Sequence, residues 1–129
     1  MTRLATAALL AMLSVSGCGG GDGGPAGVDG TKQISATSQT EKESLCDWVA
    51  GKLGGYGKAQ TCPDSLIEAP ADKADCLSGF PSCAIKVSQF EACIEKIIAA
   101  QATCTEAAFT SVMADADCLA VGQAGCFDN

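Results

Sequence analysis

The sequence predicts an all-α fold, a small bundle of short helices crosslinked by disulfides after a disordered glycine-rich tether. Apolar residues recur at helical spacing in several short stretches, and no stretch alternates polar and apolar residues long enough to form a strand. Eight cysteines are spread from Cys46 to Cys126. Because so small a domain has a thin core, crosslinks are the expected source of its stability.

The first helix is expected to begin at Thr40, which forms a capping-box pattern with Glu43. Gly54-Gly55 offers the left-handed residues that commonly end a helix. Apolar residues at a spacing of 3.6 then share one face between these limits: Leu45, Trp48, Val49 and Leu53. Pro70 suits the first position of a second, brief helix that continues through Leu77.

The most regular helical pattern follows Ser88, which forms a second capping box with Glu91. Its apolar stripe comprises Phe90, Ile94, Ile97, Ile98 and Gln101. Thr103 with Glu106 repeats the capping logic for a fourth helix. A fifth helix is expected from Asp115 to Val121, with Gly122 as its terminating residue.

The cysteines of the helical region predict a disulfide framework, because their number is even and a small exported domain needs crosslinks. Structural zinc sites favour cysteines two to four residues apart, and thioredoxin-like redox sites use CxxC; neither spacing occurs here. Metal binding and redox work remain as alternatives. The candidates for disulfide bonding are Cys46, Cys62, Cys76, Cys83, Cys93, Cys104, Cys118 and Cys126.

Geometry excludes one pairing among these cysteines. A helix from Ser88 to Gln101 would place Cys93 about 12 Å from the helix end, since each residue rises 1.5 Å. The Cα atoms of a disulfide lie within about 7 Å of each other. Cys93 should therefore join a distant segment and not Cys104.

The N-terminus carries a positive residue, Arg3, and then an apolar run from Leu4 to Val15. This run is too short to span a membrane. The sequence Val15-Ser16-Gly17-Cys18 resembles the bacterial lipobox, which implies removal of residues 1–17 and acylation of Cys18. An ordinary signal peptide cut near the same place is the alternative.

Three segments are therefore expected: a lipoprotein signal peptide (1–17), a lipidated cysteine with a flexible tether (18–39) and the helical domain (40–129). The stretch from Gly19 to Gly30 is mostly glycine, and polar residues continue to Gln39. A flexible chain of about 20 residues has a root-mean-square span of about 25 Å. The Gly-Lys-Ser/Thr sequence of a phosphate-binding loop is missing.

Composition narrows the function. After removal of residues 1–17 the chain keeps seven lysines against fifteen acidic residues and no arginine, which disfavours nucleic-acid binding. The chain has no histidine, the usual general base and a common zinc ligand. These features predict that the protein is not an enzyme, and no cofactor is expected.

Other candidate sites have ordinary structural interpretations. Asp115-Ala116-Asp117 lacks the further ligands of a calcium-binding loop, so these acids are expected at a helix start. Tyr56 and Trp48 are interpreted as turn or core aromatics. An enzyme would need carboxylate pairs as acid and base, and serine hydrolysis would need a base that is missing. The side chains in question are Asp72/Asp75, Glu91/Glu95, Ser65 and Ser88.

The segment Leu45-Cys46-Asp47-Trp48-Val49-Ala50, followed by Gly54-Gly55-Tyr56-Gly57, resembles the opening of cysteine-rich lipoproteins abundant in myxobacteria. The stretch Phe90-Glu91-Ala92-Cys93-Ile94 is similar to their recurrent middle segment. The resemblance implies a lipobox, a glycine-rich tether and a helical domain with scattered cysteines. It implies no particular activity.

These observations predict a lipid-anchored cell-envelope protein that serves as a non-catalytic binding or structural module. Its expected partners are the membrane, through acyl chains on Cys18, and an envelope protein or polymer. Resemblance to known sorting signals favours the outer membrane, because Gly19 stands where an aspartate would retain the protein in the inner membrane. The alternative is a carrier that holds a small molecule in an apolar pocket or a soft metal on cysteine thiolates.

Overall fold

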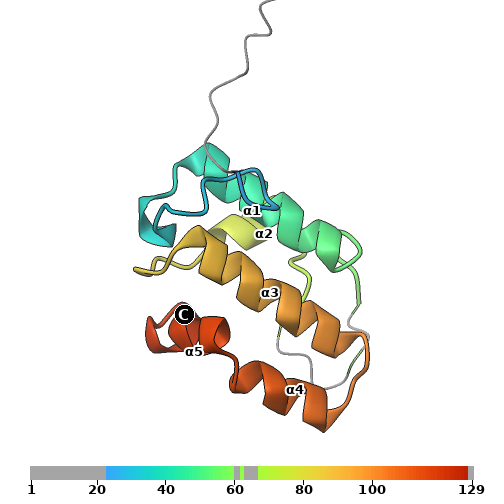
Figure 1. Ribbon diagram of the computed structural model, residues 1–129. Coiled ribbons are helices and arrows are strands. Elements are labelled where there is room, and N and C mark those ends of the chain that lie inside the picture. Colours follow the sequence, from blue (N-terminus) through green and yellow to red (C-terminus); the bar gives the residue numbers. More distant parts are fainter. Residues whose placement is uncertain (1–22, 60–61, 63–66, 128–129) are drawn as a thin grey trace, which may run out of the picture.

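The structure, a computed structural model, describes residues 23–59, 62 and 67–127. These residues contain a short 3-10 helix, five α-helices and two isolated β-bridges, but no strand, which confirms the predicted all-α class. The helices are η1 (Ile34–Ala36), α1 (Gln39–Lys52), α2 (Lys73–Ser78), α3 (Val87–Gln101), α4 (Glu106–Met113) and α5 (Ala116–Gln123) (Figure 1). Among the described residues, none of the helices has the length and apolar character that crossing a membrane requires.

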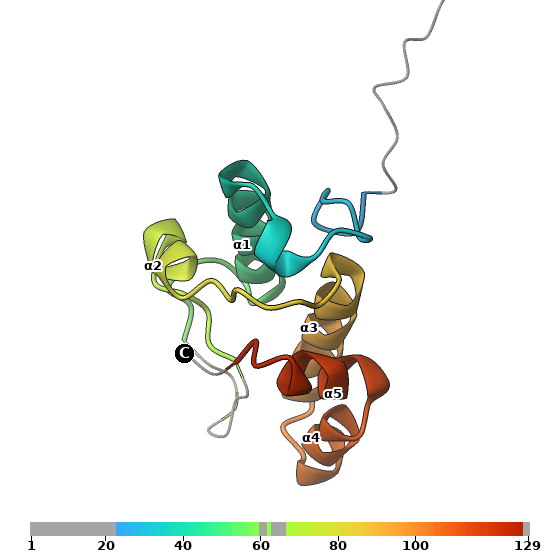
Figure 2. The ribbon, with the colours of Figure 1, turned by 90° about the vertical axis from the view of Figure 1, so that its left-hand side faces the viewer.

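Helix α3 is the centre of the fold and lies between the pair α1 and α2 and the pair α4 and α5 (Figures 1 and 2). More than half of its residues are buried, because neighbours cover it from several sides. The predicted stripe is confirmed: four of its five members are buried and the fifth is partly buried against the core. The buried four are Phe90, Ile94, Ile97 and Gln101, and the fifth is Ile98.

The helices begin and end close to where the sequence predicts, but several caps differ. Ser38 caps α1 and forms a capping box with Glu41, so Thr40 lies inside the helix. Asp72 caps α2 in place of the expected start at Pro70. Gly54 and Gly55 have φ of +93° and +116°, which ends α1 as expected.

The caps of the last three helices follow the same pattern. Helix α3 begins at Val87 and not at Ser88, because Lys86 is extended and is the residue before the first turn. Thr105, not Thr103, accepts the capping hydrogen bond of α4. Asp115 caps α5 as expected, whereas the helix passes through Gly122 and Gly125 takes the left-handed conformation, with φ of +69°.

Four disulfides crosslink the described helices and the segments between them: Cys46–Cys76, Cys62–Cys104, Cys83–Cys126 and Cys93–Cys118. The prediction for Cys93 is confirmed, because it joins α3 to α5 and not to Cys104. Each disulfide of this kind contributes about 2–4 kcal/mol by restricting the unfolded chain. The cysteines therefore hold helices that are too short to be stable alone.

The N-terminal strap, which we define as residues 23–37, corrects the predicted boundary of the domain. Its Val28 and Ile34 are only 2% and 0% exposed and belong to the hydrophobic core. Its backbone pairs with the segment that leads into α3, through four hydrogen bonds of 2.8–3.0 Å. These run from Ile34 N to Ile85 O, Ser35 N to Cys83 O, Val87 N to Lys32 O and Ser88 N to Gly30 O.

The expectation of a flexible tether over residues 18–39 is therefore wrong for the part that the structure describes. Glycine lets the strap backbone approach α3 closely: a Cβ on Gly30 would lie 3.1 Å from the Cβ of Ser88. The helical domain begins at or before Gly23, not at Thr40. Cys18 and the predicted signal peptide lie outside the described residues.

Candidate functional site

An open apolar groove lies between α1, α2, the start of α3 and the C-terminal tail. We refer to it as the groove; its volume is about 440 Å³. Phe80, Phe90 and Phe127 supply its aromatic surface. Its aliphatic lining comprises Leu45, Val49, Ile67 and Ile94. A concave, mostly apolar surface of this size is typical of ligand and peptide sites.

Two disulfides fix the walls of the groove. Cys46–Cys76 joins α1 to α2, and Cys83–Cys126 joins the segment before α3 to the tail that carries Phe127. Helix α2 has no buried residue of its own, so its position depends on this crosslink. The groove is therefore held open by covalent bonds, which lowers the entropic cost of binding.

Phe127 is the most exposed aromatic residue of the lining, at 50%. A half-exposed phenylalanine beside other apolar side chains keeps apolar surface in contact with water, which is unfavourable. A partner that covered this surface would gain binding free energy. Among the described residues, none covers the exposed half of Phe127 at the edge of the groove.

The charged side chains of the lining are both acidic. Glu68 and Asp75 line the groove, and the lining contains no lysine. Asp75 also accepts a hydrogen bond from Ala71 N at 3.0 Å. Lys42 contacts the lining from outside, where its ammonium lies 5.8 Å from the centre of the Phe80 ring.

The predicted carboxylate pairs do not form an acid and base couple. Asp72 accepts a hydrogen bond from Asp75 N as the cap of α2. Glu95 forms an ion pair with Lys52 at 3.2 Å. Each of these carboxylates therefore has a structural partner.

Glu91 is instead the contact that holds the strap. It is 2% exposed, and its Oε1 accepts a hydrogen bond from Ala26 N at 2.9 Å. Burial raises the pKa of this carboxyl, the Ala26 N–H opposes that rise, and the nearby Glu95 adds to it. A Cβ on Gly24 would lie 2.1 Å from Oε2 of Glu91, so only glycine fits between the strap and this carboxylate.

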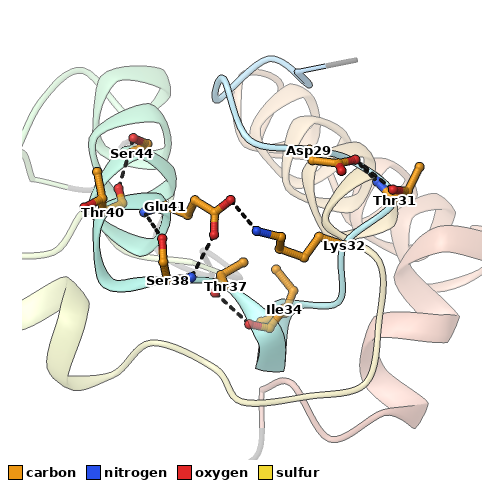
Figure 3. A network of polar contacts seen from close by, with 9 residues as sticks. All are labelled: Asp29, Thr31, Lys32, Ile34, Thr37, Ser38, Thr40, Glu41 and Ser44. Atoms are coloured by element: carbon orange, nitrogen blue, oxygen red, sulfur yellow. Dashed lines mark hydrogen bonds and ion pairs between the residues drawn. The ribbon is translucent and has the colours of Figure 1, made fainter. Parts of the chain in front are cut away.

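A polar network at the start of α1 holds the other end of the strap (Figure 3). Lys32 donates to Glu41 at 2.6 Å, and Glu41 also accepts from Ser38 N at 2.7 Å. The hydrogen bond from Lys32 is the main reason why the pKa of Glu41 is lowered. The strap is therefore fixed by charge at one end and by a buried carboxylate at the other.

The acids of the rejected calcium site lie at the helix start where the sequence predicts them. Asp115 accepts from the backbone N–H groups of Asp117 and Cys118, and Lys96 pairs with Asp115 at 2.5 Å and with Asp117 at 3.4 Å. The hydrogen bond from Lys96 lowers the pKa of Asp115. Within the part of the chain that the structure describes, no group of three or more metal-binding side chains comes together.

The two aromatics that the sequence assigns to structural roles are both partly buried. Trp48 packs against the core and is half-buried. Tyr56 donates to Asp47 at 2.8 Å; burial, with this hydrogen bond, raises its pKa to about 12. Ser88 lies in α3 beside the strap, and Ser65 lies outside the described residues.

The groove is the site that the sequence did not reveal. Its lining comes from five separate segments, and two of its walls depend on disulfide pairings that spacing alone does not determine. The one available signal was the apolar character of Phe80 and Phe127, which lie outside any helical stripe.

Comparison with protein-family models, with curated proteins and with solved structures finds no match to this chain. The function is therefore argued from the residues and the geometry alone.

Proposed function

We propose that this chain is a lipid-anchored protein of the cell envelope and that its helical domain is a non-catalytic binding module. The lipid is carried by Cys18 at the lipobox-like sequence. The binding site is the groove, and the partner is an envelope protein or polymer. The proposal favours the outer membrane, because Gly19 stands where known sorting signals that this sequence resembles carry an aspartate for retention in the inner membrane.

The main support for lipid anchoring at Cys18 is the number of cysteines and how they pair. The chain has nine, and eight of them close four disulfides within the domain. Cys18 is left with no cysteine partner in its own chain, and it is the residue that the lipobox pattern marks for acylation. Structural disulfides of this density form in exported proteins, in agreement with a signal peptide.

The geometry of the groove supports binding. Phe127 is half exposed, and Val49, Ile67 and Phe80 are partly exposed. On walls fixed by crosslinks, these apolar side chains form a preorganised surface. The carboxylates that could have served catalysis are committed to caps, ion pairs and the strap. These commitments favour binding over catalysis.

The disulfides affect the two forms of the carrier alternative, soft metal and small molecule, differently. Soft metals bind thiolates, and the eight cysteines of the domain are all bonded to one another. A small-molecule carrier remains the second candidate, because a volume of about 440 Å³ lies in the range of small-ligand pockets.

The anchoring is tested by the intact mass of the protein purified from membranes, with and without reduction. We expect acyl chains on Cys18, and a non-reduced mass lower than the reduced mass by eight hydrogens, two for each of the four disulfides. The Cys18→Ser variant should leave the membrane fraction while keeping its disulfides. An unmodified Cys18 in the membrane-bound protein would contradict the proposal.

A further inference from the structure

We infer that the partner of the groove is a protein segment with apolar side chains beside lysine or arginine, and that lipid of the domain's own membrane does not fill it. This inference rests on the proposed function, because it takes Cys18 as the anchor and the groove as the binding site. Two independent observations carry it: the charge of the groove and the length of the leash.

The charge of the groove favours a basic partner. Its lining contains two exposed carboxylates, Glu68 and Asp75, and no lysine; the cation beside it, Lys42, lies outside the lining over the Phe80 ring. The whole chain has a formal charge of −7. A lysine or arginine beside an apolar anchor would place its charge near these carboxylates while the anchor packs on Phe80 and Phe127. A second copy of this acidic chain would be repelled.

The same pattern selects a protein over a polysaccharide. The groove offers aromatic and aliphatic side chains, which bind apolar side chains, and carboxylates, which accept hydrogen bonds from ammonium or guanidinium groups. Both kinds of group occur together in a polypeptide segment. A neutral polysaccharide has apolar C–H faces that pack on aromatic rings but no cation to pair with the carboxylates.

The leash between the lipid and the folded domain is short, because the strap is part of the domain. Only five residue steps separate Cys18 from Gly23, and a fully extended chain spans at most about 18 Å over that length. A domain of about 100 residues has a radius of gyration of about 13 Å, which corresponds to a width of about 34 Å. The leash is therefore shorter than the domain is wide.

This difference restricts which face the domain can turn toward its membrane. The strap lies on the far side of α1 from α2 and from the end of the described chain (Figure 2). Helix α2 and the tail with Phe127 form two walls of the groove. Because the strap side stays near the membrane, α2 and the tail, which form two walls of the groove, lie on the side turned away from it, toward proteins of the surrounding space.

The test uses the mature lipoprotein in phosphatidylcholine vesicles and three fluorescent blocked pentapeptides. They share a Phe-Leu-Phe centre and carry Lys, Gln or Glu at both ends. We expect the Lys peptide to bind tightest and the Glu peptide weakest, by about two- to fivefold for each charge contact. The difference should shrink as salt is added.

Three substitutions distinguish a failure of this inference from a failure of the proposed function. Phe127→Ser should weaken all three peptides about tenfold, whereas Glu68→Gln should weaken only the Lys peptide. Glu106→Gln, at the exposed start of α4, is the matched charge control and should change nothing. Equal affinity for the three peptides would overturn the inference but leave the groove as a site; indifference of binding to Phe127→Ser would contradict the proposed function itself.

A separate comparison tests the claim that lipid of the domain's own membrane does not fill the groove. The Lys peptide should bind equally well to the anchored protein and to the lipid-free Cys18→Ser protein in solution. Affinity several-fold weaker on vesicles than in solution would mean that lipid occupies the groove, which would overturn the inference.

Discussion

The two sides of helix α3 are completed in opposite ways. On one side the strap covers the helix, with Ala26 bonded to Glu91 and with Val28 in the core. On the other side Phe90 and Ile94 line the groove, which no described segment closes. Adjacent residues, Phe90 and Glu91, are both buried, but Phe90 lies at the floor of the groove and Glu91 lies beneath the strap.

This difference shows that a short chain can stabilise its two sides with different interactions. The strap is glycine-rich and contributes few apolar side chains, yet it satisfies a buried carboxylate and pairs its backbone with the segment before α3. The groove has apolar walls that are held by disulfides, and no segment in the described part of the chain closes it. Coverage therefore marks the structural side, and the rigid, partly exposed side is the one that we propose to bind a partner.

The largest expected effect comes from a variant that loosens only the groove side of the domain. Replacing Cys46 and Cys76 together by alanine should lower the free energy of unfolding by about 2–4 kcal/mol, because the crosslink that fixes α2 is lost. Denaturant unfolding measures the loss, and amide exchange should show α2 opening while the strap stays protected. Equal loosening of strap and α2 would mean that the two sides are not independent.

The converse variant loosens the strap alone. Gly24→Val should cost about 1–3 kcal/mol, because the new side chain displaces Glu91 from Ala26. Peptide binding in the groove should persist. Gly51→Ala is the control, since a Cβ there meets nothing within 4 Å and alanine favours the helix by about 0.5–1 kcal/mol.

The buried carboxylate of Glu91 should give the strap side a distinct pH dependence. Because its pKa is raised in the folded protein, the folded state binds this proton more tightly, so stability from this group falls as pH rises from its unfolded pKa through the folded one. Glu91→Gln should therefore gain stability relative to the wild type as pH rises. A difference between the two proteins that stays constant with pH would exclude this role.

Glu41, at the other end of the strap, acts in the opposite sense. Its pKa is lowered, chiefly by Lys32, so its contribution is present above the ordinary carboxyl pKa and is lost as pH falls. For that reason the pH dependence is read as the difference between Glu91→Gln and the wild type, from which the contribution of Glu41 cancels.

The smallest expected effect is a change in the pKa of a tyrosine near α2, which is measured by its absorbance. Tyr56 is the chain's single tyrosine, so phenolate absorbance reports it directly, with an expected pKa of about 12. Asp47→Asn should lower this pKa toward 10.0, because the charged acceptor of its hydrogen bond is removed. An unchanged value would show that burial alone sets the shift.

Much of the fold follows from the sequence. The stripe from Phe90 to Gln101 identifies α3, and helix length alone shows that Cys93 cannot reach Cys104. The strap was missed, since a run of glycines indicates flexibility unless a partner is known. Val28 and Ile34, two apolar residues in a polar stretch, were the signal that part of it packs on the core.

The candidate site was less accessible to prediction. Lipidation at Cys18 is a local motif and can be read from neighbouring residues, and it stays a prediction here. The groove arises from long-range pairings such as Cys83 with Cys126, which are 43 residues apart. Eight cysteines allow about 105 pairings, so its walls could not be assembled from spacing.

Amide hydrogen exchange on the membrane-anchored protein tests the central contrast most directly. The amides of Gly24, Ala26 and Ile34 should exchange as slowly as those of α3, because each donates a hydrogen bond that ties the strap to itself or to the domain. The amides of α2, which has no buried residue, should exchange faster. Strap amides that exchange at the rate of an unstructured chain would contradict the account.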